Sequence, residues 1–283
     1  MDGLDPILVT GLFRGLSRHL VSLLSSLDTN DWHKPTSSSE RTIKDVAAHL
    51  LDGNIRRLSL QRDGYSAPDG PANIDSQRNL LAYLSRLNSD WTTALRRVSP
   101  RLLITWIEHT DIELAEFFES LDPFEPAAFA VAWAGEDEST NWFDVAREYT
   151  EKWHHQQQMY DALGRPSPIM DRRFYFPCLD IFMRALPFAL RNEKANDGTL
   201  VSVEVRGESG GEWFAVRENG TWVLSTEING TPTATFSIGQ DSAWKLFTKR
   251  IDREIALARF PEIKIDGDVE LASCILDMVS VMA

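Results

Sequence analysis

The sequence predicts a helical N-terminal part followed by a part that mixes strands and helices. Apolar residues recur every three or four positions as far as about residue 163, which is typical of amphipathic helices. From about residue 200, apolar and polar residues alternate instead, as they do in half-buried strands. The length of 283 residues exceeds the usual size of one domain. We therefore expect an all-helical domain at residues 1–166 and an α+β domain at residues 167–283.

Five helices are expected in the first domain, at residues 7–27, 42–62, 74–98, 100–121 and 141–163. Thr42 and Asp45 predict a capping box at the start of the second helix, and Gly164 with Pro166 ends the fifth. An apolar loop at 123–139 precedes the fifth helix. Because long loops are seldom so apolar, we expect this one to fold over a cavity mouth.

In the second domain the alternating pattern predicts strands, and two dipeptides predict turns. Asn219–Gly220 lies between two alternating runs and predicts a hairpin, and Asn229–Gly230 predicts another turn. The expected strands are 201–205, 213–216, 234–238 and 263–265, and the expected helices are 174–190, 241–247 and 269–282. One sheet with helices packed on it follows from this order.

Composition excludes several classes of partner. The formal charge is −13, from 29 basic and 42 acidic residues, which argues against nucleic-acid binding and against anionic membranes. The first residues lack the basic start of a signal peptide, and no apolar run approaches the roughly 20 residues of a membrane helix. Cys178 and Cys274 both lie in apolar surroundings and form no disulfide framework. We expect a soluble, cytoplasmic protein that acts on a small molecule.

Glu151 and His155 are the residues that point most directly to chemistry. Residues four apart on a helix lie one above the other on the same face, so this carboxylate and imidazole point into the same space. They supply two of the three ligands of a His/Glu/His metal site, and His49 of the second helix is the best candidate for the third. Three protein ligands leave a coordination position for water or substrate, as in catalytic sites.

The residues alone also allow simpler interpretations. Glu151 and His155 lie away from the apolar stripe of their helix, so they could be an ordinary pair on a solvated face. His49 could pair with Asp45 one turn earlier, or Asp45 or Asp52 could orient His49 as a metal ligand. His154 points in a different direction from His155, as a surface or packing residue would. The spacing by itself leaves these alternatives open.

Four motifs add a resemblance to a known family. They are residues 31–36, 42–50, 149–158 and 161–166. Together they resemble the DinB-like superfamily, specifically the metal-binding domain of mycothiol-dependent maleylpyruvate isomerases. The resemblance covers about residues 5–166 and implies a four-helix bundle that binds one divalent metal. Position by position, it places the metal ligands at His49, Glu151 and His155.

The resemblance has one departure and a weaker extension. Family members often carry an aspartate three residues after the last ligand histidine, where this sequence has Gln158. The isomerase substrate is therefore not carried over. Residues 241–248 and 265–272 resemble the small α+β domain that follows the bundle in these isomerases and is related to the sterol carrier protein fold.

The expected function is that of a divalent-metal-dependent enzyme, an S-transferase or isomerase that uses a low-molecular-weight thiol such as mycothiol or bacillithiol. Two imidazoles and a carboxylate suit zinc, with nickel, iron and manganese as alternatives. Arg184, Lys249 and Arg250 are candidates for holding an anionic substrate. Two other functions fit the same sequence. One is a metal-dependent hydrolase, and the other is a non-catalytic small-molecule or lipid carrier.

Overall fold

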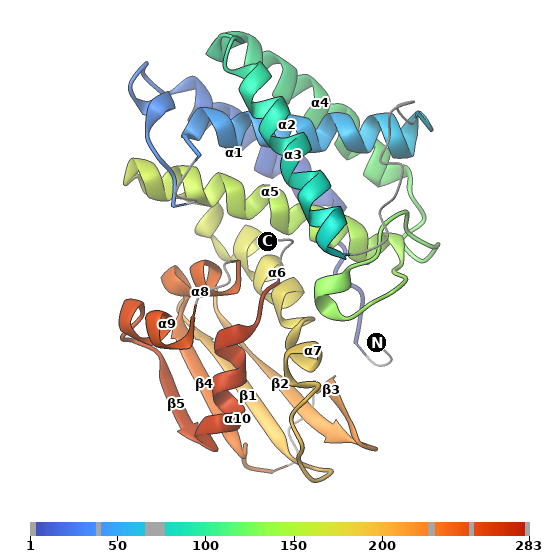
Figure 1. Cartoon of the computed structure of the whole chain (residues 1–283), viewed down its shortest axis with the longest axis vertical. Coiled ribbons are helices and arrows are strands. Elements are labelled where there is room, and N and C mark those ends of the chain that lie inside the picture. The colour runs from blue at the N-terminus through green and yellow to red at the C-terminus, as the bar shows by residue number, and fades with distance from the viewer. Residues whose placement is uncertain (1–3, 38–40, 66–76, 226–229, 249–251, 281–283) are drawn as a thin grey trace. The chain divides into compact units, whose positions relative to one another are not determined.

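A computed structural model describes residues 4–37, 41–65, 77–225, 230–248 and 252–280 of the chain (Figure 1). The chain forms two compact units. The helical unit comprises Thr10–Leu121 and His155–Pro168, and the sheet unit comprises Met1–Val9, Asp122–His154 and Ile169–Ala283. The division falls inside one continuous helix, α5, so this helix belongs to both units.

All five helices expected in the first part of the chain are present. They are α1 (Phe13–Ser25), α2 (Ile43–Arg57), α3 (Gln77–Leu95), α4 (Pro100–Ser120) and α5 (Asn141–Leu163). A 3-10 turn, Thr10–Leu12, precedes α1, and a π-helical turn, Leu58–Arg62, continues α2. The described helices include none that is both long and apolar enough to span a bilayer.

Local signals at the helix ends match the sequence. The predicted capping box opens α2, because Thr42 Oγ1 accepts a hydrogen bond from the Asp45 amide and the Asp45 carboxylate accepts one from the Thr42 amide. Ser99 caps α4, whose first residue is Pro100. Gly164 follows α5 with a φ of +62°, the left-handed conformation that commonly ends a helix.

Within the helical unit, α4 packs against both α1 and α2, and α3 packs against α2. A buried carboxylate joins three of these helices, since Asp111 of α4 accepts hydrogen bonds of 2.8 Å from Ser17 of α1 and from Asn54 of α2. Apolar side chains fill the space around this network: Leu16, Leu20, Leu24, Val46, Leu50, Leu51, Leu103, Ile107, Leu114 and Phe118.

The sheet unit contains one mixed five-stranded sheet in the order β3-β2-β1-β4-β5. Its strands are β1 (Leu200–Arg206), β2 (Gly211–Glu218), β3 (Thr221–Ser225), β4 (Ala234–Gly239) and β5 (Lys264–Gly267). β1 pairs with β4 in parallel, and the other three pairings are antiparallel. The predicted hairpin joins β2 to β3, and Asn219 and Gly220 have φ values of +48° and +76°, as a type I′ turn requires.

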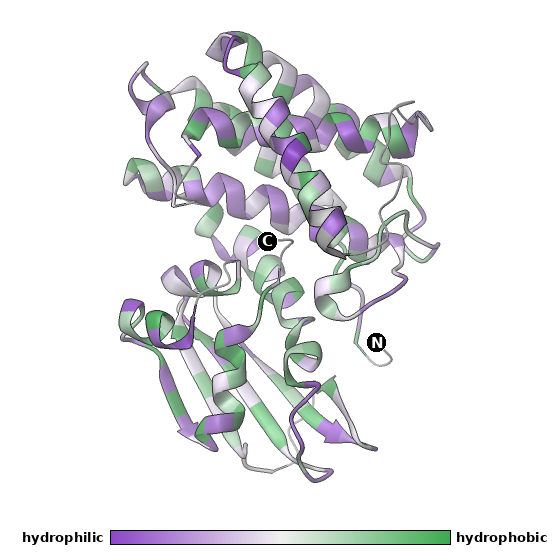
Figure 2. Cartoon of the chain, viewed as in Figure 1, coloured by the Kyte–Doolittle hydropathy of each residue, from purple (hydrophilic) through white to green (hydrophobic). Residues whose placement is uncertain are grey.

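In the described part of this unit, the helices that follow α5 are α6 (Arg172–Met183), α7 (Leu186–Leu190), α8 (Gln240–Phe247), α9 (Arg253–Arg259) and α10 (Val269–Ser273). α6 packs on β2, α7 on β3, α8 on β1 and β4, and α10 on β4 and β5. Figure 2 shows the contrast with α5, whose middle is coloured as hydrophilic, whereas the strands are mostly pale or hydrophobic.

Three expectations need correction. The expected helix at 269–282 ends much earlier, because a 3-10 turn at Cys274–Asp277 follows α10 and Met278 is extended. Ser280 is then tied to the Phe247 and Phe182 carbonyls, which holds this stretch out of a helix. Helix α9 was not expected from the sequence. The expected helix at 174–190 is two helices, α6 and α7. The turn expected at Asn229 lies outside the described residues.

The apolar loop between α4 and α5 is only partly buried. Val131 is buried, whereas Phe124 is 66% exposed. A 3-10 turn at Ala132–Ala134 lies inside the loop and leads to Gly135, whose φ is +86°. A Cβ atom at Gly135 would lie 2.6 Å from the Phe188 ring, so glycine permits the close approach of the loop to α7.

Candidate metal centre

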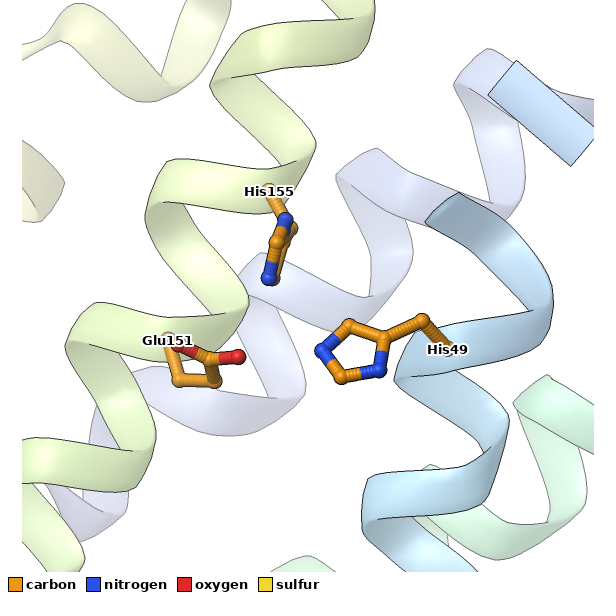
Figure 3. A group of neighbouring side chains, drawn as sticks. All are labelled: His49, Glu151 and His155. Atoms are coloured by element: carbon orange, nitrogen blue, oxygen red, sulfur yellow. The ribbon is translucent and has the colours of Figure 1, made fainter. Parts of the chain in front are cut away.

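The structure brings the three predicted ligand residues together. The nitrogens of His49 and His155 and a carboxylate oxygen of Glu151 can be chosen so that all lie within 4.8 Å of one another. Figure 3 shows the three side chains pointing toward one another, His49 from α2 and the other two from α5. The imidazole rings have centroids 4.8 Å apart and planes at 82°, so they meet edge to face.

Each ligand is placed by the packing of its own helix. His49 is a half-buried residue of α2, and its sequence neighbours Ala48 and Leu50 are both buried. Glu151 precedes His155 by one turn of α5, which explains why their side chains share a face. His155 is 7% exposed, and the side chain of Glu151 retains 31% exposure. The centre is therefore partly buried, with His155 its most enclosed residue and with His49 and Glu151 half-buried.

A hydrogen bond fixes the orientation of the His155 ring. Its Nδ1 donates to Oε1 of Gln158, at 3.0 Å, and both side chains are buried. With the proton on Nδ1, Nε2 keeps the lone pair that a metal ligand needs. Sequence reasoning treated Gln158 only as a departure from a family pattern and missed this contact. The i,i+3 spacing from His155 was the available signal.

The run of three glutamines divides into three different contacts. The side-chain amide of Gln156 donates to the Leu16 carbonyl and accepts from the Leu20 amide of α1. Gln157 accepts a hydrogen bond from Ser167 at 2.6 Å. Gln158 alone contacts a candidate ligand. All three are buried, so the run is part of the interior and not a polar surface.

The solvated-face interpretation of α5 does not hold. Asp144 and Glu148, which share the face of Glu151 and His155, are both buried. Arg147 donates to Asp144 from the following turn. His154 is also buried. Its Nδ1 donates to the Thr150 carbonyl at 3.2 Å and lies 3.7 Å from Glu151 Oε2. His154 was expected to be a surface or packing residue, and the structure shows that it is a buried packing residue.

The two carboxylates near His49 have other partners. Asp45 accepts hydrogen bonds from Thr42 and from Arg96, the residue that follows α3, and Asp52 forms an ion pair of 3.0 Å with Arg56. Burial raises the pKa of Asp52 in spite of Arg56. Burial also acts to raise the pKa of Asp45, but the hydrogen bonds from Thr42 and Arg96 outweigh it, so the pKa is lowered.

The first part of α5 is anchored in the sheet unit by aromatic side chains. Trp153 stacks on Tyr175 of α6 with ring centroids 4.5 Å apart and planes 5° apart, and its indole N–H donates to the Ile169 carbonyl. Tyr149 donates to the Phe174 carbonyl at 2.8 Å. These contacts fix the rotation of α5 about its axis and so fix the direction of Glu151, which lies between the two aromatic residues.

The candidate anion-binding residues have different outcomes. Arg184 is buried, with its guanidinium carbon 5.5 Å from the centre of the Trp142 ring. Lys249 and Arg250 lie outside the described residues. Both cysteines are free and buried, and burial raises the pKa of the Cys178 thiol well above its usual value. A buried protonated thiol of this kind is a poor nucleophile.

Comparison with known proteins identifies a family that matches this sequence. The sequence profile of the mycothiol maleylpyruvate isomerase N-terminal domain matches residues 13–160, more than half of the chain. A crystal structure of a histidine-to-alanine mutant of the mycothiol-dependent maleylpyruvate isomerase is similar in fold, with a TM-score of 0.51, 11% identity and coverage of 91% of each chain. A second structure of that isomerase gives a TM-score of 0.47 at 13% identity, covering 84% of this chain and 86% of its own. No curated protein matches the chain.

The profile spans α1 to most of α5 and contains all three candidate ligands. On this evidence the chain belongs to the mycothiol maleylpyruvate isomerase N-terminal domain family.

Proposed function

We propose that the protein is a divalent-metal-dependent enzyme, an isomerase or S-transferase that uses a low-molecular-weight thiol in the manner of maleylpyruvate isomerase. The observation that carries the proposal is the convergence of His49, Glu151 and His155 from two helices that are about 100 residues apart in sequence. Membership of the family whose name includes mycothiol and maleylpyruvate supports the choice of thiol chemistry.

The three side chains fit a divalent ion by donor type and by distance. Two imidazole nitrogens and one carboxylate oxygen are a common catalytic zinc set, and the same set also suits iron. In a tetrahedral site with bonds of about 2.0–2.1 Å, neighbouring donor atoms lie about 3.3 Å apart. The present atoms lie within 4.8 Å, so modest side-chain rotations are enough to close the site. We propose zinc first and nickel, iron or manganese as alternatives.

When bound, such an ion would hold the sulfur of a small thiol in its thiolate form near neutral pH. The protein's own residues do the remaining work. Gln158 accepts a hydrogen bond from Nδ1 of His155 and so holds the ring with Nε2 facing the centre. Partial burial of the three side chains reduces their contact with bulk water and so strengthens the attraction between the centre and an anionic sulfur.

The reaction class that fits this site is reversible thiol addition. A thiolate adds to one carbon of an electrophilic double bond, and the resulting single bond can rotate. Expulsion of the same thiolate then restores the double bond, so no atom is gained or lost in an isomerisation. The thiol is consumed only when the adduct is released as product, which is the transferase outcome. Mycothiol is the first candidate because the family and the similar structures carry its name, and bacillithiol is the second.

Finer features of the fold are also proposals. We assign the helical part to a DinB-like four-helix bundle, supported by the packing of α1, α2 and α4 and by the reach of Gln156 from α5 to α1. We assign the sheet part to the sterol-carrier-like class, supported by its mixed sheet with helices packed on it. We also propose that the boundary between the two domains lies at residue 166 and that the protein is located in the cytoplasm. The two free cysteines support a reducing compartment.

Elemental analysis of the purified protein and its variants tests the metal. We expect about one divalent ion per chain, lost in His49→Ala and in His155→Ala with the fold retained by circular dichroism. The matched control is His109→Ala, because His109 is an exposed histidine of α4 whose partner is Glu113. Unchanged metal content in either ligand variant overturns the proposed centre. Assays with mycothiol, bacillithiol, glutathione or no thiol then decide the chemistry, and full activity without thiol favours the hydrolase.

A further inference from the structure

Arg184 is a buried cation whose side chain is only partly satisfied. It follows α6 directly and is 4% exposed. Its Nη2 donates to the Asp5 carbonyl at 2.8 Å, whereas Nε and Nη1 are buried without a hydrogen-bond partner among the described residues. These two atoms together carry three N–H bonds. A buried charge in such a state is costly unless something of opposite charge completes it.

No carboxylate of the described residues completes it. Arg184 forms no ion pair within 4 Å in that part of the chain, although Asp180 and Asp5 are near enough to act on it electrostatically. The Asp180 carboxylate instead accepts the indole N–H of Trp213 at 2.9 Å. Burial lowers the pKa of Arg184 and outweighs the opposing attraction of Asp180 and Asp5, which agrees with a guanidinium whose loss of water is only partly compensated.

The wall beside Arg184 is aromatic and carries a second unsatisfied donor. The Trp142 ring faces the guanidinium and stacks on Phe143, with centroids 4.9 Å apart. Phe143 in turn meets the edge of Trp133 at 5.8 Å, and the buried indole N–H of Trp133 also lacks a partner among the described residues. The N–H groups of Arg184 and of Trp133 thus lack acceptors among the described residues, and the stacked rings of Trp142 and Phe143 lie between them. This arrangement resembles the lining of a site for a small organic anion.

We infer that Arg184 binds a carboxylate group of the substrate, with the Trp142–Phe143 pair as the apolar wall beside it. The identification of the anion as substrate rests on the proposed function, whereas the anion site itself does not. Trp142 and Glu151 are nine residues apart on α5, about 13–14 Å along the helix axis. The carboxylate at Arg184 therefore belongs to a part of the substrate remote from the reacting carbon, where it contributes binding and orientation.

Titration of the metal-free, full-length protein with maleate tests this inference. Maleate is a small dicarboxylate, and maleamide is the matched neutral control. Trp142 lies next to the guanidinium, so binding is followed by tryptophan fluorescence together with calorimetry. We expect maleate to bind, maleamide not to bind, and Arg184→Met to weaken maleate binding roughly ten- to hundredfold. Arg191→Met is the control variant, because Arg191 is an exposed arginine at the end of α7.

Two further variants separate the possible outcomes. Because the methionine removes a buried charge that is only partly compensated, Arg184→Met should unfold at the same temperature as the parent protein or higher. If that variant does not fold, Arg184→Lys keeps the charge but loses most of the donors and should still weaken binding. His155→Ala should bind maleate normally, so failure of the metal centre leaves this result intact. Absence of maleate binding to the parent protein, or equal binding by the folded Arg184 variants, overturns the inference.

Discussion

Replacing Gln158 by alanine is expected to weaken divalent-metal binding by roughly 10- to 100-fold, the usual effect of losing a group that orients a ligand histidine. Gln158 accepts the Nδ1–H of His155 at 3.0 Å, and both side chains are buried. In the metal-free variant the His155 ring is free to turn and seek another acceptor. A bound metal holds Nε2 in place, which leaves Nδ1–H buried without an acceptor.

The size of the effect follows from this difference between the two states. A buried donor without an acceptor costs about 1–3 kcal/mol. Since 1.4 kcal/mol corresponds to a factor of ten, the expected loss is about one to two powers of ten in affinity. Gln158→Glu keeps an acceptor for Nδ1–H and adds negative charge beside the imidazole, so we expect it to bind metal at least as tightly as the parent protein.

Competition against a chromogenic chelator at fixed pH measures these affinities. Gln157→Ala is the matched control, because Gln157 is a buried neighbour whose side chain accepts from Ser167 and not from a candidate ligand. Circular dichroism and thermal melting show whether each variant is folded. Metal affinity of Gln158→Ala within twofold of the parent protein, in a folded variant, would refute the reasoning, as would an equal loss in Gln157→Ala.

Three further predictions concern stability and reactivity. Asp45→Asn should cost about 1 kcal/mol at neutral pH through the damaged helix cap. Burial opposes ionisation of Asp45, but hydrogen bonds from Thr42 and Arg96 lower its pKa overall. The stability that ionised Asp45 gives the fold is therefore fully present above its ordinary pKa of 3.8 and is lost as the pH falls through the lowered pKa. Urea unfolding of parent and variant between pH 7 and pH 3 checks this, and a constant difference across the range contradicts it. Trp153→Ala should destabilise by about 3–5 kcal/mol because the ring is completely buried, and a loss below about 1 kcal/mol in urea unfolding would show that the site repacks. Cys178 should resist a thiol reagent at pH 8 until denaturant is added, because burial raises the pKa of its thiol, and rapid labelling of the native protein would count against the described packing.

Periodicity and end signals predicted most of the elements because they are local properties of the chain. The five helices of the first part, the capping box at Thr42 and the hairpin at Asn219–Gly220 are all confirmed. The α-helix expected at 269–282 ends at Ser273, and residues 278–280 are not helical because contacts of Ser280 with remote carbonyls decide the conformation there. Tertiary contacts of this kind leave no trace in the local pattern.

The sequence predicted the three residues of the candidate centre but not the burial of the residues around them. The spacing of Glu151 and His155 and the family motifs named all three ligands, which the structure places together, while metal binding stays a prediction. Burial of the polar face of α5 could not be read from the sequence. A face with Asp144 and Glu148 normally points to water, and only the folded chain covers it. The vacant donors of Arg184 are likewise visible only in three dimensions.

The continuity of α5 has a practical consequence for dissecting the chain. A fragment ending at residue 166 would keep the whole helix but would lack Tyr175 and Ile169, which cover the ring and the N–H of Trp153. The hydroxyl of Tyr149 would lose the Phe174 carbonyl in the same cut. Such a truncated product would expose the rings of Tyr149 and Trp153, which lie two residues before and two residues after Glu151. Attempts to study the ligand trio in isolation should therefore retain α6, or else replace both rings with polar side chains.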